Sequence, residues 1–192
     1  MRPMKTFAEI AFTPAVQTLQ SAHGSRAAYA RMQNNSPSVE GLGRLEADFL
    51  SNVDSFFIAT VSETGWPYVQ HRGGPSGFLK VISPERVAFA DFAGNRQYVS
   101  AGNVSQVDRA AIIAVDYAAQ RRLKLLGHLR FEDLGSADPE LVLAVELPGY
   151  RARVERIAVI EVEAFDWNCP QHIPQRKDKV RGGLAGGEPP YP

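Results

Sequence analysis

The chain has 192 residues, of which 44% are hydrophobic and 22% charged, a composition typical of a globular domain and not of a disordered chain. Its 21 basic and 21 acidic residues give no net charge, which disfavours nucleic acid or an anionic membrane as the main partner. The single Cys169 excludes an internal disulfide framework and a multi-cysteine metal site. No apolar run reaches the roughly 18 residues of a membrane span, and the N-terminus lacks a secretory signal pattern. We therefore expect a soluble, cytoplasmic protein without a metal site.

Residues 1–53 are predicted to form a helical extension. Thr13 and Pro14 are typical of an N-cap and a first helical position, and they open a helix over 14–22. A second short helix over 25–34 and a third from about 39 to 53 follow, the last with apolar residues at helical spacing.

From residue 56 onward the pattern changes to that of strands separated by tight turns. A helix capped by Asn95 is expected over 96–104, and another over 138–147. Strands of similar length with helices between some of them indicate a mainly β (α+β) fold, with an antiparallel sheet closed into a barrel. The ranges that favour strands are 56–61, 66–71, 78–82, 86–92, 109–117, 122–131 and 156–165.

A basic, glycine-rich stretch over 70–81 is the first candidate for a binding site. His71 and Arg72 end one predicted strand, and Lys80 lies inside the next one among apolar neighbours. If these two strands pair, Arg72 and Lys80 meet near one end of a hairpin, where a bound phosphate would partner the cations. A hairpin that holds both cations on its solvated face explains the same pattern about equally well.

The stretch 91–98 is the second candidate. Arg96 and Gln97 are placed in the first turn of the predicted helix, where free backbone N–H groups and the helix dipole favour an anion. An arginine at that end opposes the dipole unless an anion is near, which indicates phosphate. Simple capping by Asn95, with Arg96 in water, is the competing interpretation.

Two further stretches are weaker candidates. The strand over 122–131 places basic residues on one face, which a half-exposed strand explains for most of them, with Arg122 the exception. Cys169 and His172 have a spacing that some metal sites use, but two ligands do not close a zinc site. Trp167 is suited either to cover a planar ligand or to anchor a core or an interface.

The order and spacing of the motifs FFIATVSETGWPYVQHRGG, GFLKV, FADFAGNRQY, DRAAIIAVDY and RRLKLLGHLRF resemble the pyridoxamine 5′-phosphate oxidase-related, FMN-binding split-barrel family over about residues 40–170. The resemblance implies a six-stranded split barrel over 54–170, flanked by helices, between the extension 1–53 and a tail over 171–192. It also implies a homodimer with FMN at the subunit interface. Trp167 would come from the other subunit in such a dimer.

What the resemblance implies for the site is a set of cofactor-binding positions without an assigned catalytic residue. Arg72 and Lys80 match the family's arginine and lysine, although extra residues separate them here. Asn95, Arg96 and Gln97 match a phosphate-binding Ser-Arg-Lys turn, with Gln97 in place of the lysine. The full set implied as FMN-binding is His71, Arg72, Phe78, Lys80, Asp91, Asn95, Arg96, Gln97, Arg122 and Trp167.

The leading functional hypothesis is an FMN-dependent oxidoreductase that acts on an unidentified small molecule, with NAD(P)H or a partner as electron donor. The family's substrate pattern is not recognisable in QHIPQRKDKVRGG, so oxidation of pyridoxamine phosphate is not expected. Two alternatives stay open: a non-catalytic flavin or haem binder or sensor, and an F420-dependent reductase on the same fold.

Overall fold

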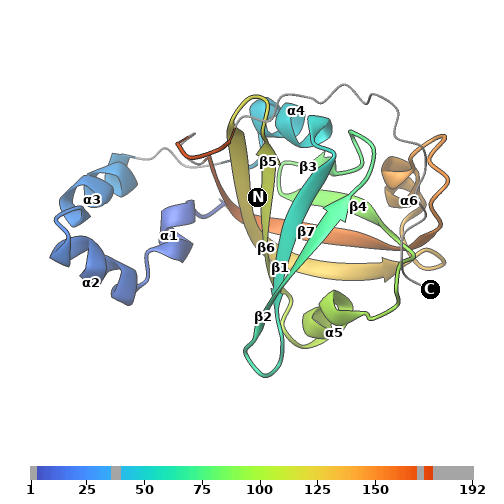
Figure 1. The fold of residues 1–192 in the computed structure, drawn as a ribbon, viewed down its shortest axis with the longest axis horizontal. Helices are drawn as coiled ribbons and strands as arrows, with labels where there is room; N and C mark the ends of the chain where they lie inside the picture. Colours follow the sequence, from blue (N-terminus) through green and yellow to red (C-terminus); the bar gives the residue numbers. More distant parts are fainter. Residues whose placement is uncertain (1–3, 36–39, 168–170, 175–192) are drawn as a thin grey trace.

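The computed structural model describes residues 4–35, 40–167 and 171–174, so most of the predicted tail and Cys169 lie outside the described residues. A seven-stranded antiparallel sheet forms the body of the molecule, in the order β2-β1-β5-β6-β7-β4-β3 (Figure 1). The strands are β1 Ser55–Val61, β2 Pro67–Gly73, β3 Lys80–Ser83, β4 Arg86–Phe92, β5 Arg109–Asp116, β6 Arg121–Asp133 and β7 Val154–Trp167.

The expectation of a closed, six-stranded barrel is corrected on both counts. The count of six came from the resemblance alone, whereas the strand-like stretches in the sequence number seven, as observed. β2 and β3 are the two edges of the sheet and do not pair with each other, so backbone hydrogen bonds leave the sheet open. The antiparallel sheet with helices is consistent with a split-barrel fold.

The pairing of strands also corrects the predicted hairpin between residues 66–71 and 78–82. β2 pairs only with β1, whereas β3 pairs with β4 at the opposite edge. The segment between β2 and β3 crosses from one edge to the other, and its residues Phe78 and Leu79 are buried in the core on the way. Burial of these two side chains outweighs the local turn signal of the glycines, so Arg72 and Lys80 do not meet across a hairpin.

The sheet curls around one main hydrophobic core, in which Phe56 of β1 packs edge-on against Phe89 of β4 at 5.2 Å and stacks on Phe78 at 5.5 Å. β1 and β4 are not neighbours in the sheet, so these contacts bring its two halves together across the core. A second cluster lies on the other face of β4 and β7, where helix α6 (Pro139–Val145) supplies Leu141 and Val145. The middle of these two strands is therefore covered on both faces, which explains their almost continuous apolar sequences.

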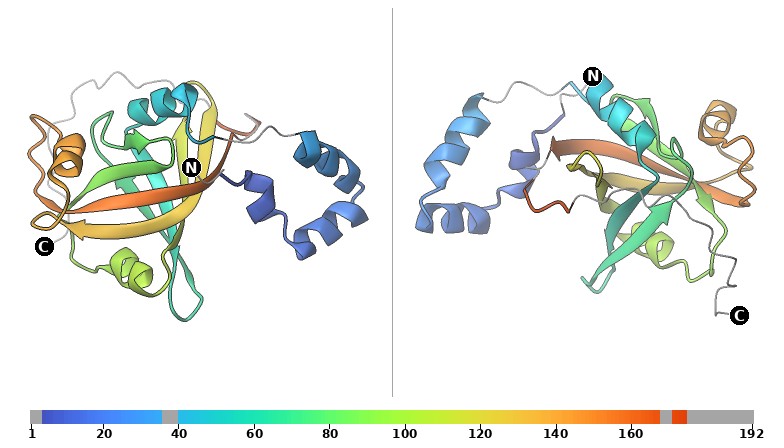
Figure 2. Two further views of the ribbon diagram at one scale, coloured as in Figure 1. Left: turned by 180° about the vertical axis from the view of Figure 1, so that it is seen from behind. Right: turned by 45° about the horizontal axis from the view of Figure 1, so that its top comes forward.

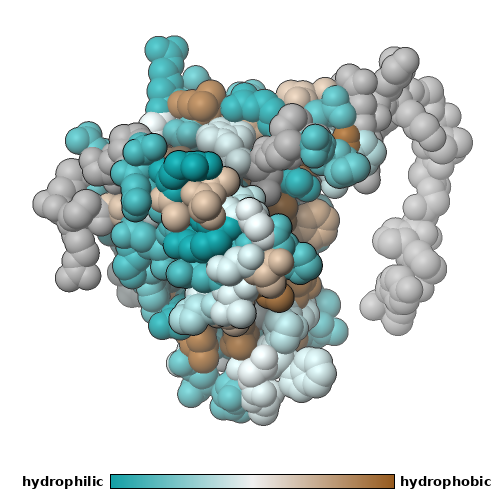
Figure 3. Space-filling model, turned by 90° about the vertical axis from the view of Figure 1, so that its left-hand side faces the viewer, coloured by the Kyte–Doolittle hydropathy of each residue, from teal (hydrophilic) through white to brown (hydrophobic). Residues whose placement is uncertain are grey.

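Helices α1 (Phe7–Ala11), α2 (Pro14–Ala22) and α3 (Arg26–Asn35) form an arm that extends away from the sheet (Figure 1, Figure 2). The helix over 14–22 is confirmed, and Thr13 caps it by accepting a hydrogen bond from Val16 N. The short helix α1 was not predicted, although Thr6 and Glu9 form a capping box in front of it. Seen from the side of the arm, hydrophilic residues dominate, with hydrophobic patches below them (Figure 3).

Helix α4 (Arg44–Asn52) covers one end of the curled sheet and helix α5 (Val99–Gln106) the other (Figure 1). The prediction that α5 begins at residue 96 is wrong by three residues, because Arg96 and Tyr98 adopt left-handed backbone conformations with φ of 60° and 53°. No helix among the described residues has both the length and the apolar character that crossing a membrane requires.

Candidate functional site: a basic cleft at the end of strands β2, β4 and β7

A cleft of about 60 Å³ opens where the ends of β2, β4 and β7 meet the N-terminus of α5. Three arginines and two carboxylates line it, which leaves a formal excess of one positive charge: Arg72, Arg96, Arg156, Asp91 and Glu155. The loop between β4 and α5 supplies most of the remaining wall.

Asp91 holds this end of the curled sheet together. It is 3% exposed, and its two carboxylate oxygens accept hydrogen bonds from Arg72 Nη1 at 2.6 Å and from Arg156 Nη2 at 2.7 Å. Because β2 and β4 are far apart in strand order, the pair of Arg72 and Asp91 bridges a gap that no backbone hydrogen bond closes. The side chains therefore join the curled sheet at this end.

The two arginines of this cluster are themselves held by aromatic rings. The guanidinium of Arg156 lies 4.5 Å from the ring centre of Phe131 and 5.3 Å from that of Tyr98. The Nε–H groups of Arg72 and Arg156 are buried and have no hydrogen-bond partner within the described part of the chain. Each arginine thus retains a donor that an acceptor in the cleft could use.

The loop before α5 presents a third cation. Asn95 Oδ1 accepts a hydrogen bond from Gln97 N at 3.2 Å, which forms a local turn around the left-handed Arg96. Asn95 therefore caps this turn and not the helix. A hydrogen bond with Tyr98 raises the pKa of Arg96 and the nearby carboxylate of Glu155 adds to the increase, so its guanidinium stays protonated.

Helix α5 begins without a side-chain cap. Tyr98 occupies the N-cap position, and its hydroxyl donates to Glu155 Oε1 at 2.5 Å instead of turning back to the helix. Ser100, in the first turn, donates from its hydroxyl to Gln70 Oε1 of β2 at 2.8 Å. The first backbone N–H groups of α5 therefore keep their capacity to bind an anion at the cleft.

Five of the ten residues implied as FMN-binding line this cleft: Arg72, Asp91, Asn95, Arg96 and Gln97. The other five do not: His71, Phe78, Lys80, Arg122 and Trp167. Phe78 is buried in the main core, and His71 points away from the cluster because it lies opposite the outward-facing Phe57. Their roles at a cofactor stay predictions.

Lys80 is also placed away from the cleft. It lies opposite Ala88, which packs in the second cluster, whereas Asp91 lies on the main-core face of the same strand. Lys80 forms no hydrogen bond or ion pair with any described residue. Its Nζ lies close to Gly77, 4.0 Å from where a Cβ on that glycine would be.

Arg122 and Trp167 lie at the opposite end of the sheet. Leu123 pairs with Trp167 at that end, whereas Asp133 pairs with Arg156 at the cleft. The 11 residue steps from Arg156 to Trp167 correspond to roughly 36 Å along β7 at about 3.3 Å per residue. A single chain therefore does not bring these two residues to the cleft.

Trp167 anchors the chain in which it lies. Its Nε1 donates to the buried Glu46 Oε1 at 2.7 Å, and its ring meets Phe49 of α4 edge-on at 4.8 Å. The guanidinium of Arg121 lies 4.3 Å from the centre of the same ring. The anchoring role weighed in the sequence analysis is thus present, and its role at a cofactor of a partner chain stays a prediction.

Sequence reasoning missed Arg156, Tyr98 and Glu155, which all line the cleft. One signal was available for Arg156. A carboxylate within the apolar strand RVAFADF must be paired with a cation, and Arg156 opens the strand that lies next to it. Among the described residues, no three His, Cys, Asp or Glu side chains gather as a metal-ligand set.

No model of a protein family matches this sequence, and no curated protein shows significant similarity to it. The chain is similar in structure to HupZ of Group A Streptococcus, with 14% sequence identity and a TM-score of 0.53 over 71% of this chain and 99% of HupZ. At this identity the likeness shows a shared fold.

Two other solved structures are similar at lower scores. A proposed pyridoxamine 5′-phosphate oxidase from Lactobacillus delbrueckii is 17% identical, with a TM-score of 0.49 over 66% of this chain and 93% of that protein. An FMN-binding protein from Syntrophomonas wolfei is 10% identical, with a TM-score of 0.48 over 77% of this chain and 96% of that protein.

Proposed function

We propose that this chain is an FMN-binding flavoprotein whose basic cleft holds the phosphate of the cofactor, and that it acts as an oxidoreductase on a small molecule. The observation that carries the proposal is the convergence of Arg72, Arg96 and Arg156 on one cleft at the uncapped N-terminus of α5. A phosphate monoester carries nearly two negative charges near neutral pH and is bound by such donors in charge-assisted hydrogen bonds.

The cleft fits a phosphate group. Its positive excess complements the anion, and the unpaired Nε–H groups of Arg72 and Arg156 supply buried donors. Arg96 is the residue best suited to contact the phosphate directly, because Asp91 already neutralises part of the charge of the other two arginines. Arg72 and Arg156 would then fix the position of the cleft and the orientation of what binds in it.

The size of the cleft supports a site shared between two copies of the chain. Pockets that enclose a cofactor or a drug-sized ligand usually measure about 300–1,000 Å³. The cleft of one chain, at about 60 Å³, holds the phosphate end only. In the proposed homodimer the partner supplies the wall for the isoalloxazine ring, with Arg122 and Trp167 as its candidate contributions.

Bound FMN would supply the electron transfer, and the protein would position and tune it. We propose NAD(P)H or a partner protein as the source of electrons. The residues of this chain that line the cleft bind and orient; the described structure assigns none of them to proton transfer.

The test is a titration of purified, flavin-free protein with FMN, followed by quenching of flavin fluorescence and by the visible spectrum. Wild-type protein should bind FMN saturably, and Arg96→Glu should abolish binding because it sets a carboxylate against the phosphate. Arg151→Glu, an exposed arginine outside the cleft, is the matched control and should bind as the wild type does.

Normal FMN affinity in Arg96→Glu would contradict the proposed phosphate site. A haem Soret band or exclusive binding of F420 would contradict FMN as the cofactor. Turnover of NAD(P)H by the FMN-loaded protein then separates an enzyme from a carrier.

A further inference from the structure

A second cavity, larger than the cleft, lies between helix α1 and the outer face of strands β1, β5 and β6. Its volume of about 660 Å³ lies within the range of sites for small organic ligands. It shares no lining residue with the basic cleft, and it does not depend on the proposed function.

The floor of the cavity is apolar and is hollowed by small side chains. Ala59 of β1 lies opposite Ala111 of β5, which in turn lies opposite Leu126 of β6, so the three residues form a row across the outer face. Ile10 of α1 and Val61 of β1 add apolar surface to the walls. This part of the cavity favours an apolar group.

One end of the cavity presents the cation Arg109. Arg109 and His128 face each other across β5 and β6, one step along the strands from the apolar row. Arg109 forms no ion pair or side-chain hydrogen bond with any residue in the described part of the chain, and it is exposed at the rim. An unpaired guanidinium at the edge of an apolar hollow is suited to bind a carboxylate or sulfonate.

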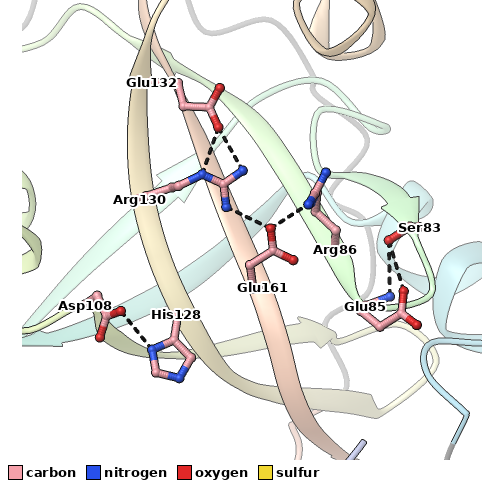
Figure 4. Close-up of polar contacts among 8 residues, drawn as sticks. All are labelled: Ser83, Glu85, Arg86, Asp108, His128, Arg130, Glu132 and Glu161. Atoms are coloured by element: carbon pink, nitrogen blue, oxygen red, sulfur yellow. Dashed lines mark hydrogen bonds and ion pairs between the residues drawn. The ribbon is translucent and has the colours of Figure 1, made fainter. Parts of the chain in front are cut away.

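The other charged groups at the rim are already occupied. Glu9 accepts a hydrogen bond from Thr6 N at 2.6 Å within the capping box of α1. Its carboxylate is therefore engaged by the N-terminus of its own helix. Glu163 lies 3.5 Å from Lys5 Nζ and 3.4 Å from His128 Nε2. Asp108 lies 2.9 Å from His128 Nδ1 and fixes the orientation of the imidazole (Figure 4).

We propose that this cavity binds a small amphipathic organic anion, with its apolar body on the alanine floor and its acidic group at Arg109. The charge of Arg109 and the apolar row together define this ligand class, because neither a neutral lipid nor an inorganic anion would use both. Helix α1 forms one wall of the site. The segment is held by the ion pair of Lys5 with Glu163 and by Phe7, whose ring centre lies 4.0 Å from Lys124 Nζ.

The test uses the full chain, with 8-anilinonaphthalene-1-sulfonate as fluorescent probe and octanoate and 1-octanol as competitors of equal chain length. The probe should bind saturably, and octanoate should displace it at least tenfold more effectively than 1-octanol. Arg109→Gln should remove this preference, whereas Arg151→Gln should leave it unchanged.

Ala111→Phe provides the second variant, because it fills the cavity at a half-buried strand position where an aromatic residue is tolerated. It should lose binding of the probe while it keeps the wild-type circular dichroism spectrum. Equal displacement by the two competitors, or probe binding retained in Ala111→Phe, would overturn the proposal. Absence of probe binding, with an Ala111→Phe variant that changes the molar mass in light scattering, would show instead that a second copy of the chain covers this face.

Discussion

The basic cleft and the cavity beneath α1 are built in opposite ways. In the cleft, the main ion pairs join residues far apart in sequence, and Asp91 is bound by an arginine 19 positions before it and another 65 positions after it. In the cavity, neighbouring strands supply small side chains in register, and most charges lie at the rim.

This difference shows what each region requires. The cleft depends on buried charges that stabilise the fold only while they remain paired. The cavity depends on how closely neighbouring strands approach each other and on the small size of the alanine side chains on its floor. Substitutions that break pairing should therefore act on the first region, and substitutions that add volume should act on the second.

The largest effect is expected at Asp91. Asp91→Asn removes the charge that neutralises Arg72 and Arg156, whose side chains are mostly buried, and should lower the free energy of unfolding by about 3 kcal/mol. Urea unfolding followed by circular dichroism measures this loss. Asp48→Asn is the matched control: its ion pair with Arg44 is exposed, so it should change stability by less than about 0.5 kcal/mol. Similar losses in the two variants would refute the role of Asp91 as the link between β2, β4 and β7.

The next effect is expected at Gly127, in the wall of the cavity. A Cβ at this position would lie 2.2 Å from the backbone oxygen of Glu161 on the adjacent strand, which cannot move without disturbing the sheet. Gly127→Ala should therefore cost about 2 kcal/mol of stability, measured in the same urea experiment. Gly102→Ala in α5, where no atom lies within 4 Å of the added Cβ, should be neutral or stabilise by up to about 1 kcal/mol. A neutral Gly127→Ala would contradict the close approach of β6 and β7.

The smallest effect concerns how the contribution of His128 to the free energy of unfolding changes with pH. A hydrogen bond to Asp108 raises the pKa of His128 above 6.5, against an opposing effect of burial, and Glu163 adds to the increase. Arg109 lies opposite it on β5 and Glu161 opposite it on β7, so charges of both signs surround the ring. Because the folded-state pKa is raised, the stabilisation is complete below about pH 6.5 and is lost as pH rises through that pKa.

The measurement compares wild type with His128→Gln between pH 5.5 and pH 9. The stability difference should be larger at the acidic end, by about 0.5 kcal/mol or less, since solvent screens the half-exposed ring. A difference that grows toward alkaline pH would contradict this assignment.

The sequence was informative where local rules act. The strand 86–92 was predicted at its observed bounds, because a nearly continuous apolar run between turn residues defines it. The helix 14–22 was equally well defined by its cap and proline. The outward basic residues of β6 were also interpreted correctly as a half-exposed face, since Lys124, His128 and Arg130 all form ion pairs there.

The sequence was less informative where distant segments meet. The pairing of the strands depends on the burial of segments such as Phe78 and Leu79. The glycines next to this segment suggest a local turn, so the sequence pattern alone does not indicate that burial. The start of α5 was misplaced because Arg96 and Tyr98 adopt left-handed conformations, which their residue types rarely do. Arg156 was missed because its partner Asp91 lies 65 positions away in the sequence.

The most direct test of the central claim, that the cleft recognises the phosphate of FMN, compares the affinities of the chain for FMN and riboflavin, which differ only in that phosphate. Wild-type protein should bind FMN at least tenfold more tightly than riboflavin, and Arg96→Gln should reduce this preference to near one by weakening FMN alone. Equal affinities of the wild type for the two flavins would show that the arginines of the cleft serve only the fold.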